Sequence, residues 1–202
     1  MRFTAVLLAG GQSTRMGADK AFVRLAGKPL VEWVLDALEP LTRSFVIVAN
    51  DLPKFAAYES RARVVADDPP RAGPLAALRA GLRNSRQDWV FVTSCDAPFL
   101  QPAFVQALAR FTRGADAAVP GSPEERWPLT AFYHQRCMPA LDRAVQRDDK
   151  KIIAFFPDVA VRWVPLDELR RWDPELRSLW NVNSPTELEK AEALLAKASR
   201  AG

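Results

Sequence analysis

The stretch that decides the fold is FTAVLLAGGQSTRMGADK, which occupies residues 3–20. It begins with an apolar run at residues 3–9, whose length and composition are typical of a buried β-strand. Gly10 and Gly11 follow at once, and glycines let a backbone turn and approach a ligand closely while its amides bind an anion. The stretch therefore predicts a strand that leads either into a phosphate-binding loop or into a plain tight turn. It matches neither the P-loop pattern nor the GxGxxG dinucleotide fingerprint.

Working outward, further short apolar runs alternate with segments of helical periodicity. Strands are predicted at residues 45–49, 63–66, 89–94, 115–120, 129–133 and 159–165. Helices are predicted at residues 29–41, 74–82 and 102–111, and a last helix follows Ser184-Pro185-Thr186-Glu187, which reads as a capping box. This alternation predicts the α/β class: a single Rossmann-like domain with a mostly parallel central sheet and helices on both faces.

Composition and charge narrow the class of protein. The chain has 202 residues, of which 49% are hydrophobic and 26% charged, as expected for one globular domain. Its two cysteines, Cys95 and Cys137, lack metal-ligand or disulfide-scaffold spacing, which fits a reduced, cytoplasmic setting. We find neither a transmembrane run nor a signal peptide. The net charge is +4, and the basic residues are scattered along the chain. This pattern favours a small anionic substrate over nucleic acid or a membrane.

Polar residues follow the predicted strands at the sheet edge where open α/β sheets bind ligands. Asp96 comes after the run at residues 89–94, and Asn50 and Asp67 come after two earlier runs. A carboxylate there suits Mg²⁺, which keeps several waters and shares its site with substrate phosphates. A turn before Pro98 accounts for Asp96 equally well.

Two further segments carry candidate ligand groups. Asn181 and Asn183 are two positions apart, so an extended backbone would place both side chains on one face, near a phosphate or its waters. The same segment also reads as a turn into the last helix. Gly73 and Pro74 open a predicted helix, where exposed amides favour a phosphate or a polar base edge.

Several motifs together resemble one family. LAGGQSTRMGADK fills every fixed position of LAGGxSxRMGxDK, the signature of nucleotidyltransferases that attach a nucleotide to the molybdenum cofactor. The likeness continues in order with GKPL at 27–30, GPL at 73–75, CDAPFL at 95–100 and NVNSP at 181–185. The chain thus resembles the molybdenum cofactor guanylyltransferase family. It departs from the usual GPLAG motif at Ala77, which stands where the family has glycine.

The resemblance implies a fold and an activity. The fold is a single domain of the nucleoside-diphospho-sugar transferase type over residues 1–202, with a nucleotide-binding part at about 1–114 and an acceptor-binding part at about 115–202. The activity is Mg²⁺-dependent transfer of GMP from GTP to the terminal phosphate of molybdenum-molybdopterin. Transient contacts with a molybdenum-insertion protein and with acceptor apoenzymes are also implied. A cytidylyltransferase, another small-molecule nucleotidyltransferase and a non-catalytic nucleotide-binding subunit remain alternatives.

The resemblance also implies roles for individual residues. The expected catalytic residues are Arg15, Lys20 and Asp96, and Asp96 is the expected metal ligand. The expected nucleotide-binding residues are Leu8, Ala9, Gly10, Gly11, Lys20, Asn50, Asp67, Gly73, Pro74 and Asp96. The expected acceptor-binding residues are Arg126, Trp127, Lys150, Lys151, Asn181 and Asn183.

Some of these assignments have competing interpretations from the residues themselves. One carboxylate can accept both the N1–H and the exocyclic amine of guanine, and Asp67 is the candidate, but its neighbour Asp68 offers the same chemistry. Trp127 fits either stacking on a pterin or core packing. Lys150 and Lys151 fit either an anionic acceptor or a solvated charge cluster. His134, the single histidine, is expected at the surface or in packing.

Overall fold

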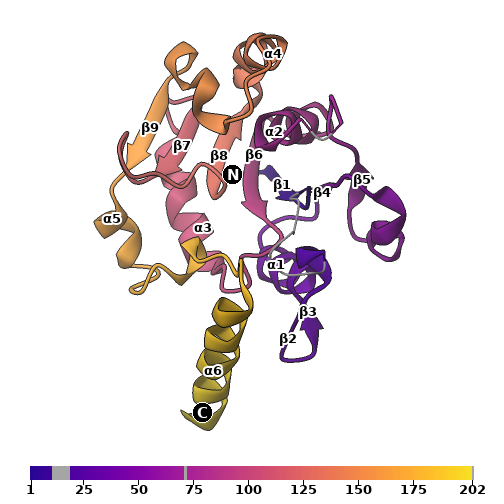
Figure 1. Cartoon of the computed structure of the whole chain (residues 1–202). Coiled ribbons are helices and arrows are strands. Elements are labelled where there is room, and N and C mark those ends of the chain that lie inside the picture. The colour runs from indigo at the N-terminus through magenta and orange to yellow at the C-terminus, as the bar shows by residue number, and fades with distance from the viewer. Residues whose placement is uncertain (11–18, 71, 202) are drawn as a thin grey trace.

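The computed structural model describes residues 1–10, 19–70 and 72–201. Its centre is a seven-stranded sheet with the order β5-β4-β1-β6-β8-β7-β9 (Figure 1). The strands are β1 (Phe3–Leu8), β4 (Phe45–Val48), β5 (Arg63–Val65), β6 (Trp89–Ser94), β7 (Ala117–Pro120), β8 (Ala131–His134) and β9 (Val161–Val164). Only β8 in this sheet runs antiparallel to its neighbours, β6 and β7. The prediction of a mostly parallel sheet is confirmed.

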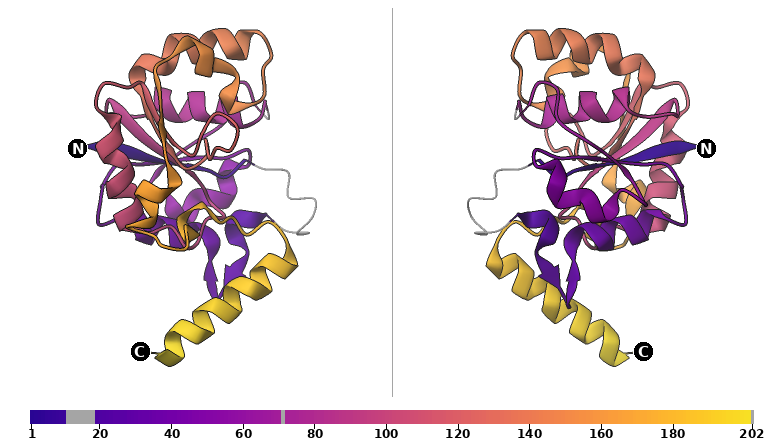
Figure 2. Two further views of the ribbon diagram at one scale, coloured as in Figure 1. Left: turned by 90° about the vertical axis from the view of Figure 1, so that its left-hand side faces the viewer. Right: turned by 90° about the vertical axis from the view of Figure 1, so that its right-hand side faces the viewer.

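Helices cover both faces of this sheet, as predicted. One face packs against α1 (Leu30–Leu38), α3 (Pro102–Ala109) and α5 (Leu166–Arg170), and the other against α2 (Pro74–Arg83) and α4 (Met138–Gln146) (Figures 1 and 2). Alternate side chains of β1 supply the two cores, with Leu7 on the first face and Val6 on the second. Because both faces are buried, the strand reads as a continuous apolar run rather than an alternating one.

The chain supplies the sheet in two blocks. The strands before residue 95 form β5-β4-β1-β6, and the strands after residue 116 form β8-β7-β9. Apolar periodicity locates each strand to within about two residues, but it contains no information on this spatial order. Short 3-10 helices complete the described elements: Lys20–Phe22, Leu52–Tyr58, Arg110–Thr112, Gln135–Cys137, Ile152–Asp158 and Arg177–Leu179.

The start of α1 differs from the prediction. The helix begins at Leu30 because Pro29 pairs with Arg24 in a small hairpin of β2 (Arg24–Leu25) and β3 (Lys28–Pro29). At the hairpin turn Gly27 has φ of 80°, which a glycine adopts without strain. The helix ends at Leu38 rather than at residue 41, since Pro40 cannot donate the next hydrogen bond. The prediction overlooked α4 and α5, both in the half after Gly114.

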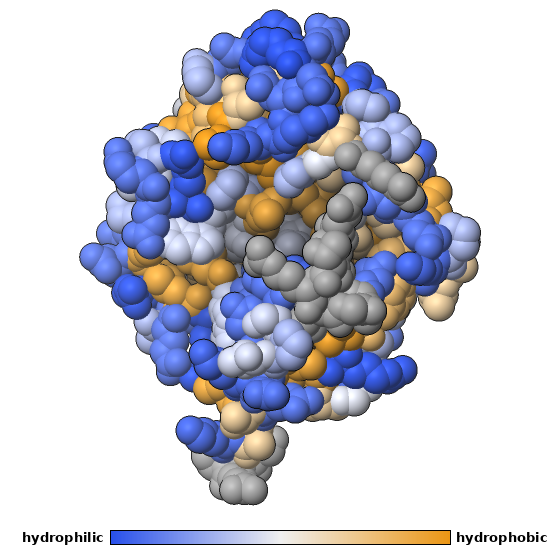
Figure 3. All heavy atoms as spheres, in the orientation of Figure 1, coloured by the Kyte–Doolittle hydropathy of each residue, from blue (hydrophilic) through white to orange (hydrophobic). Residues whose placement is uncertain are grey.

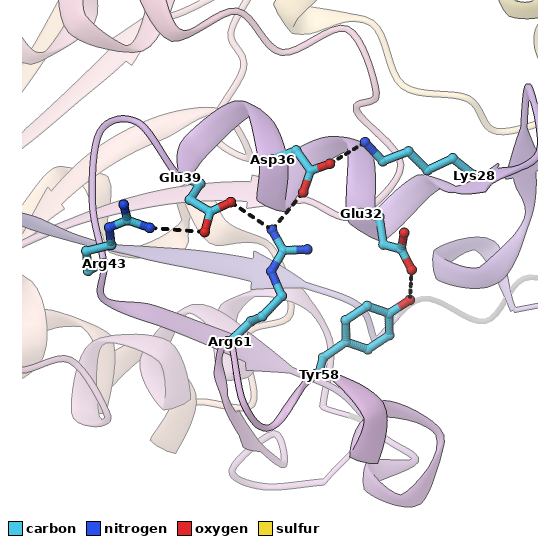
Figure 4. Close-up of polar contacts among 7 residues, drawn as sticks. All are labelled: Lys28, Glu32, Asp36, Glu39, Arg43, Tyr58 and Arg61. Atoms are coloured by element: carbon cyan, nitrogen blue, oxygen red, sulfur yellow. Dashed lines mark hydrogen bonds and ion pairs between the residues drawn. The ribbon is translucent and has the colours of Figure 1, made fainter.

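The polar side of α1 ties the helix to the segment that follows β4 (Figure 4). Tyr58 donates to Glu32 at 2.9 Å, and Arg61 and Lys28 both form ion pairs with Asp36. Burial and the Glu32 contact raise the pKa of Tyr58 to about 12, so the phenol stays protonated. Burial alone would raise the pKa of Asp36, but its two basic partners hold it below the usual value. The contacts of Tyr58 and Arg61 hold the end of the 3-10 helix Leu52–Tyr58 and the residues after it against α1.

The last helix, α6 (Pro185–Ala201), projects from the body beside the β2–β3 hairpin (Figure 2). A small separate core of Leu25, Leu30, Val182 and Ala191 anchors it. The first half of the predicted capping box is confirmed, since Ser184 Oγ accepts from the Glu187 N–H at 3.2 Å. None of the described helices is both long and apolar enough to cross a membrane.

Candidate active site

A cleft of about 750 Å³ opens at the carboxyl ends of β1, β4 and β6. Figure 3 shows a hollow near the middle of this face, where Figure 1 draws β1 and β6. Ten predicted site residues line the cleft: Leu8, Ala9, Gly10, Lys20, Asn50, Gly73, Pro74, Asp96, Asn181 and Asn183. Seven further residues also line it: Asp19, Asp51, Lys54, Phe55, Ala77, Ser94 and Leu129. The cleft therefore gathers residues from both ends of the chain.

A chain of polar contacts centred on Lys20 crosses this cleft. The Lys20 ammonium lies 3.3 Å from Asp96 Oδ2 and donates to Asn183 Oδ1 at 2.7 Å. On its other oxygen, Asp96 accepts from Ser94 Oγ at 2.5 Å. Asp96 is 6% exposed, and each of its carboxylate oxygens contacts a protein group. This arrangement concentrates positive charge next to a fixed carboxylate, which suits the binding of phosphates together with a metal ion.

The side chains around Asp96 fit a Mg²⁺ site that is shared with the substrate. Asp96 offers a carboxylate, and the amide side chains of Asn181 and Asn183 lie in the same cleft. Within residues 1–10, 19–70 and 72–201, the cleft included, no group of three or more His, Cys, Asp or Glu side chains is placed to hold a metal ion. Mg²⁺ in phosphoryl-transfer sites commonly takes one or two carboxylates and completes its shell with waters and substrate phosphates. The chemistry present matches that pattern rather than a protein-only cage.

Gly10 has a steric reason to be glycine. The Asn50 amide donates to the Gly10 carbonyl at 3.1 Å. A Cβ at position 10 would lie 3.1 Å from Asn50 Nδ2 and 3.4 Å from Asp67 Oδ1. The backbone after β1 thus passes directly over the Asn50 and Asp67 side chains, which belong to the ends of the neighbouring strands.

The structure separates the two adjacent carboxylates that the sequence left ambiguous. Asp67 is buried, with 4% of its surface exposed, and faces Gly10. Asp68 instead points to the outer side of α2, where its carboxylate pairs with Arg83 at 2.8 Å and Arg79 at 3.5 Å. Asp67 is therefore the member of the pair placed beside the cleft.

Lys54 is a charged cleft residue that the sequence interpretation missed. Its ammonium lies 3.3 Å from Asp51 Oδ2 and 3.6 Å from Asp19 Oδ2. Asp51, and then Asp19, raise its pKa, so the side chain remains a cation. The signal was hidden because Lys54 lies in a 3-10 helix whose residues show neither strand nor helical periodicity.

The start of α2 differs in part from expectation. Gly73 has φ of 94°, which favours glycine, and both Gly73 and Pro74 line the cleft. However, the first free amide of the helix is already used, because Leu75 N–H donates to the Lys150 carbonyl at 3.3 Å. That amide does not face a ligand as predicted. The contact also explains where Lys150 lies: its backbone packs against the start of α2, while its ammonium pairs with Asp148.

Four predicted acceptor residues are not among the described lining of the cleft: Arg126, Trp127, Lys150 and Lys151. Arg126 instead lines a separate groove of about 440 Å³ with Phe156 and Trp163. A bridge between Gly121 and Arg126 folds this loop back on the end of β7, so it does not reach the cleft. Of the predicted acceptor set, Asn181 and Asn183 are the two that the cleft brings together with the nucleotide residues.

Gly11 and Arg15 lie outside the described residues. His134 confirms the packing interpretation: it pairs with Trp89 at the amino end of β6, and its ring lies edge-on to that indole at 4.9 Å. Burial and the nearby Arg136 lower the pKa of His134, so it is neutral at pH 7. Since the cleft lies at the opposite end of β6, the histidine takes no part in it.

The family model of the MobA-like NTP transferase domain matches residues 5–160. The chain belongs to this family. The resemblance seen in the sequence motifs is thereby confirmed, and the chain takes its place among the nucleotidyltransferases.

Relatives within the family match almost the whole chain. The molybdenum cofactor guanylyltransferase of Desulfosudis oleivorans is 34% identical over 200 residues, which cover 98% of this chain and 97% of that protein. The Vibrio cholerae protein of the same name is 34% identical over 192 residues, with 94% and 91% coverage. The crystal structure of molybdopterin-guanine dinucleotide biosynthesis protein A from Archaeoglobus fulgidus superposes with a TM-score of 0.84 at 31% identity, covering 96% of this chain and 100% of that one.

A more distant neighbour defines the wider fold. The 2-C-methyl-D-erythritol 4-phosphate cytidylyltransferase of Thermus thermophilus has a TM-score of 0.69 at 18% identity, covering 97% of this chain and 100% of that one. At that identity the likeness concerns the fold alone. It confirms the prediction of a nucleoside-diphospho-sugar transferase type of architecture.

Proposed function

We propose that this protein transfers GMP from GTP to the terminal phosphate of molybdenum-molybdopterin, releasing pyrophosphate. The observation that carries the proposal is the contact chain Ser94–Asp96–Lys20–Asn183 within one cleft. It lies beside Gly10 and Asp67 in a family whose full-length relatives are named molybdenum cofactor guanylyltransferases.

The reaction requires the protein mainly to position the acceptor phosphate and GTP. A phosphate monoester has its second pKa near 6, so at neutral pH the acceptor phosphate is already mostly a dianion. It attacks the α-phosphorus of GTP in line: a new P–O bond forms there while the bond to the β-phosphate oxygen breaks, and pyrophosphate takes that electron pair. A general base is not needed, which agrees with the distance of His134 from the cleft.

The side chains of the cleft then hold anions in place. Lys20, together with Arg15 and the amides that follow β1, binds the phosphates of GTP, and Lys54 adds a second ammonium to the same cleft. Asp96 holds Mg²⁺, which supplies positive charge beside the phosphates when it is bound. Asn181 and Asn183 bind the acceptor phosphate or its waters. Arg126, Trp127, Lys150 and Lys151 would reach only the distant part of a large acceptor.

Choice of base is assigned to Asp67. Guanine presents N1–H and an exocyclic amine side by side, and a single carboxylate accepts both. Asp67 is buried next to the backbone of Gly10, so its carboxylate would favour a base that presents two adjacent donors. GTP is therefore the proposed substrate.

The setting proposed for this reaction is the cytoplasm. Both cysteines are buried and free, which suits a reducing compartment. Handover of the product to acceptor apoenzymes, and receipt of the cofactor from an insertion protein, are proposed as transient contacts.

The test is a reconstituted reaction with each of GTP, CTP, ATP and UTP, molybdopterin as acceptor and Mg²⁺. We expect pyrophosphate release and a guanine dinucleotide product, identified by mass, with GTP alone giving fast turnover. Asp96→Asn should lower the rate by at least about 100-fold, whereas Asp88→Asn, an exposed carboxylate at the other end of β6, should not change it.

Three results would contradict the proposal. Preferred use of CTP would indicate a cytidylyltransferase. Nucleotide binding without turnover would indicate a non-catalytic subunit. Equal turnover without Mg²⁺ would remove the metal assignment of Asp96.

A further inference from the structure

The capping of α6 has an unusual second half. In the ordinary capping box the acidic side chain at the third helical position returns to the backbone N–H of the N-cap residue. Here Glu187 reaches one residue further back: its Oε2 accepts from the Asn183 N–H at 2.6 Å, while its own N–H donates to Ser184 Oγ. The carboxylate thus holds a residue that lines the cleft, although Glu187 itself is not among the described lining residues.

Three polar groups of Asn183 form hydrogen bonds: its backbone N–H, its Nδ2 and its Oδ1. Its backbone N–H is bound by Glu187, and its Nδ2 donates to the Asn181 carbonyl at 3.1 Å. Its Oδ1 accepts from the Lys20 ammonium at 2.7 Å. Because an ammonium only donates, the carboxamide must present its oxygen to Lys20. The Glu187 contact with the backbone and the Lys20 contact with the side chain therefore involve one residue, Asn183.

The segment that contains Asn183 is joined to the metal-binding end of the cleft. The neighbouring Val182 N–H donates to the Asp96 carbonyl at 2.8 Å, and the Lys20 ammonium lies 3.3 Å from Asp96 Oδ2. Val182 is fully buried against Leu25, a residue of the hairpin that follows Lys20. The packing of Val182 against Leu25 thus joins the segment that contains Asn183 to the hairpin that follows Lys20.

We propose that Glu187 is a positioning residue for the reaction: by fixing the Asn183 backbone it fixes the amide oxygen that orients Lys20 beside Asp96. The proposal rests on the proposed function of the cleft. A positioning role predicts that the length of the side chain at position 187 matters more than its charge, because the contact is one hydrogen bond to the Asn183 N–H. A role through the helix dipole alone would depend instead on negative charge near the helix start.

Two substitutions separate reach from charge. Glu187→Gln keeps the length and an accepting oxygen but removes the charge. Glu187→Asp keeps the charge but is shorter by one methylene group. We expect Glu187→Gln to retain kcat within about threefold, and Glu187→Asp and Glu187→Ala to lower it about tenfold or more, since a small displacement of a charged group costs that much. Glu189→Ala, an exposed acidic residue on the same helix, is the matched control and should not change kcat.

The proposed route through Lys20 has its own test. In a Lys20→Ala background, Glu187→Asp should have little further effect on the rate, because residues acting as a unit are not additive. A second full loss in that background would overturn the proposal. So would unchanged kcat in folded Glu187→Asp, or a larger loss in Glu187→Gln than in Glu187→Asp.

Hydrogen exchange keeps the inference independent of turnover. The Asn183 amide should exchange slowly in the wild type and in Glu187→Gln, and markedly faster in Glu187→Asp. Failure of the wild type to turn over any nucleotide would defeat the proposed function, and the exchange rates would still decide the contact. Equal Asn183 exchange in wild type, Glu187→Gln and Glu187→Asp would defeat the positioning role itself.

Discussion

The Asn183 carboxamide oxygen accepts a hydrogen bond from the Lys20 ammonium at 2.7 Å, although 163 positions separate the two residues. Lys20 follows the first strand of the sheet, and Asn183 precedes the last helix. The contact therefore joins two distant parts of the chain within one cleft. Variants at each end of it should affect the same step.

Removing the Lys20 ammonium should affect turnover far more than stability. We expect Lys20→Met to lower kcat/KM for GTP by about 100-fold or more, as found for loss of one preorganised charge-stabilising group. The control is Lys28→Met, which removes an ammonium that pairs with Asp36 and lies over the Trp33 ring, on the outside of α1. Steady-state kinetics of both variants would check this, and equal losses would contradict it.

The neighbouring carboxylates Asp67 and Asp68 offer a matched pair for base selection. Asp67→Asn replaces an acceptor oxygen with an NH₂ donor opposite two guanine donors, so the affinity for GTP should fall by about tenfold or more. Asp68→Asn removes only the ion pairs that the exposed Asp68 carboxylate makes with Arg79 and Arg83, worth at most about 1 kcal/mol of stability. Calorimetric titration with GTP and CTP would measure both, and a loss confined to Asp68→Asn would refute the assignment.

Asp116 should make stability depend on pH in the acid range. Its carboxylate accepts from the Ala160 N–H at 3.0 Å and from Arg136 at 2.8 Å, and these contacts lower its pKa. A lowered folded-state pKa adds stability above the unfolded pKa of about 3.9, and that stability is lost as pH falls through the folded value. Asp116→Asn should thus cost about 1 kcal/mol at pH 7.

Urea unfolding across the pH range would test this expectation. The difference between wild type and Asp116→Asn should shrink as the pH falls below about 4. Asp158→Asn, which loses one exposed contact to Arg143, serves as the comparison and should show a smaller difference throughout. A difference for Asp116→Asn that grows toward low pH would have the wrong sign.

Both thiols should be inert in the folded protein. Burial raises the pKa of Cys95 well above its usual value, and burial raises the pKa of Cys137 to about 12. Since the thiolate is the reactive form, a disulfide reagent at pH 8 should label neither residue until the protein unfolds. Rapid labelling of Cys95 in the native state would show that the segment beside Asp96 opens.

Physical regularities explain which features the sequence could predict. Buried strands need apolar residues on both faces, so β1, β4 and β6 were found from composition alone, and Asp96 and Asn50 could be placed at one sheet edge by position in the chain. The β2–β3 hairpin escaped because two residues per strand show no periodicity. Lys54 escaped for the same reason, since a 3-10 helix of seven residues has no repeated face.

Contacts between distant loops set the remaining limits. That Asp67 faces inward while Asp68 faces Arg83 depends on side-chain direction after β5, which neighbouring carboxylates do not reveal. The separation of Arg126 from the cleft depends on its bridge to Gly121. The reach of Glu187 to Asn183 departs from the standard capping pattern, so the motif predicted the helix start but not its connection to the cleft.

The Lys20–Asn183 contact has a consequence for the order in which the protein is made. A ribosome builds the chain from its amino end, and early segments begin to fold before late ones exist. Gly10, Lys20 and Asp96 are therefore synthesised well before translation reaches Asn183. A chain that ended before Asn183 would lack the amide that orients Lys20. We therefore expect unfinished chains not to turn over GTP.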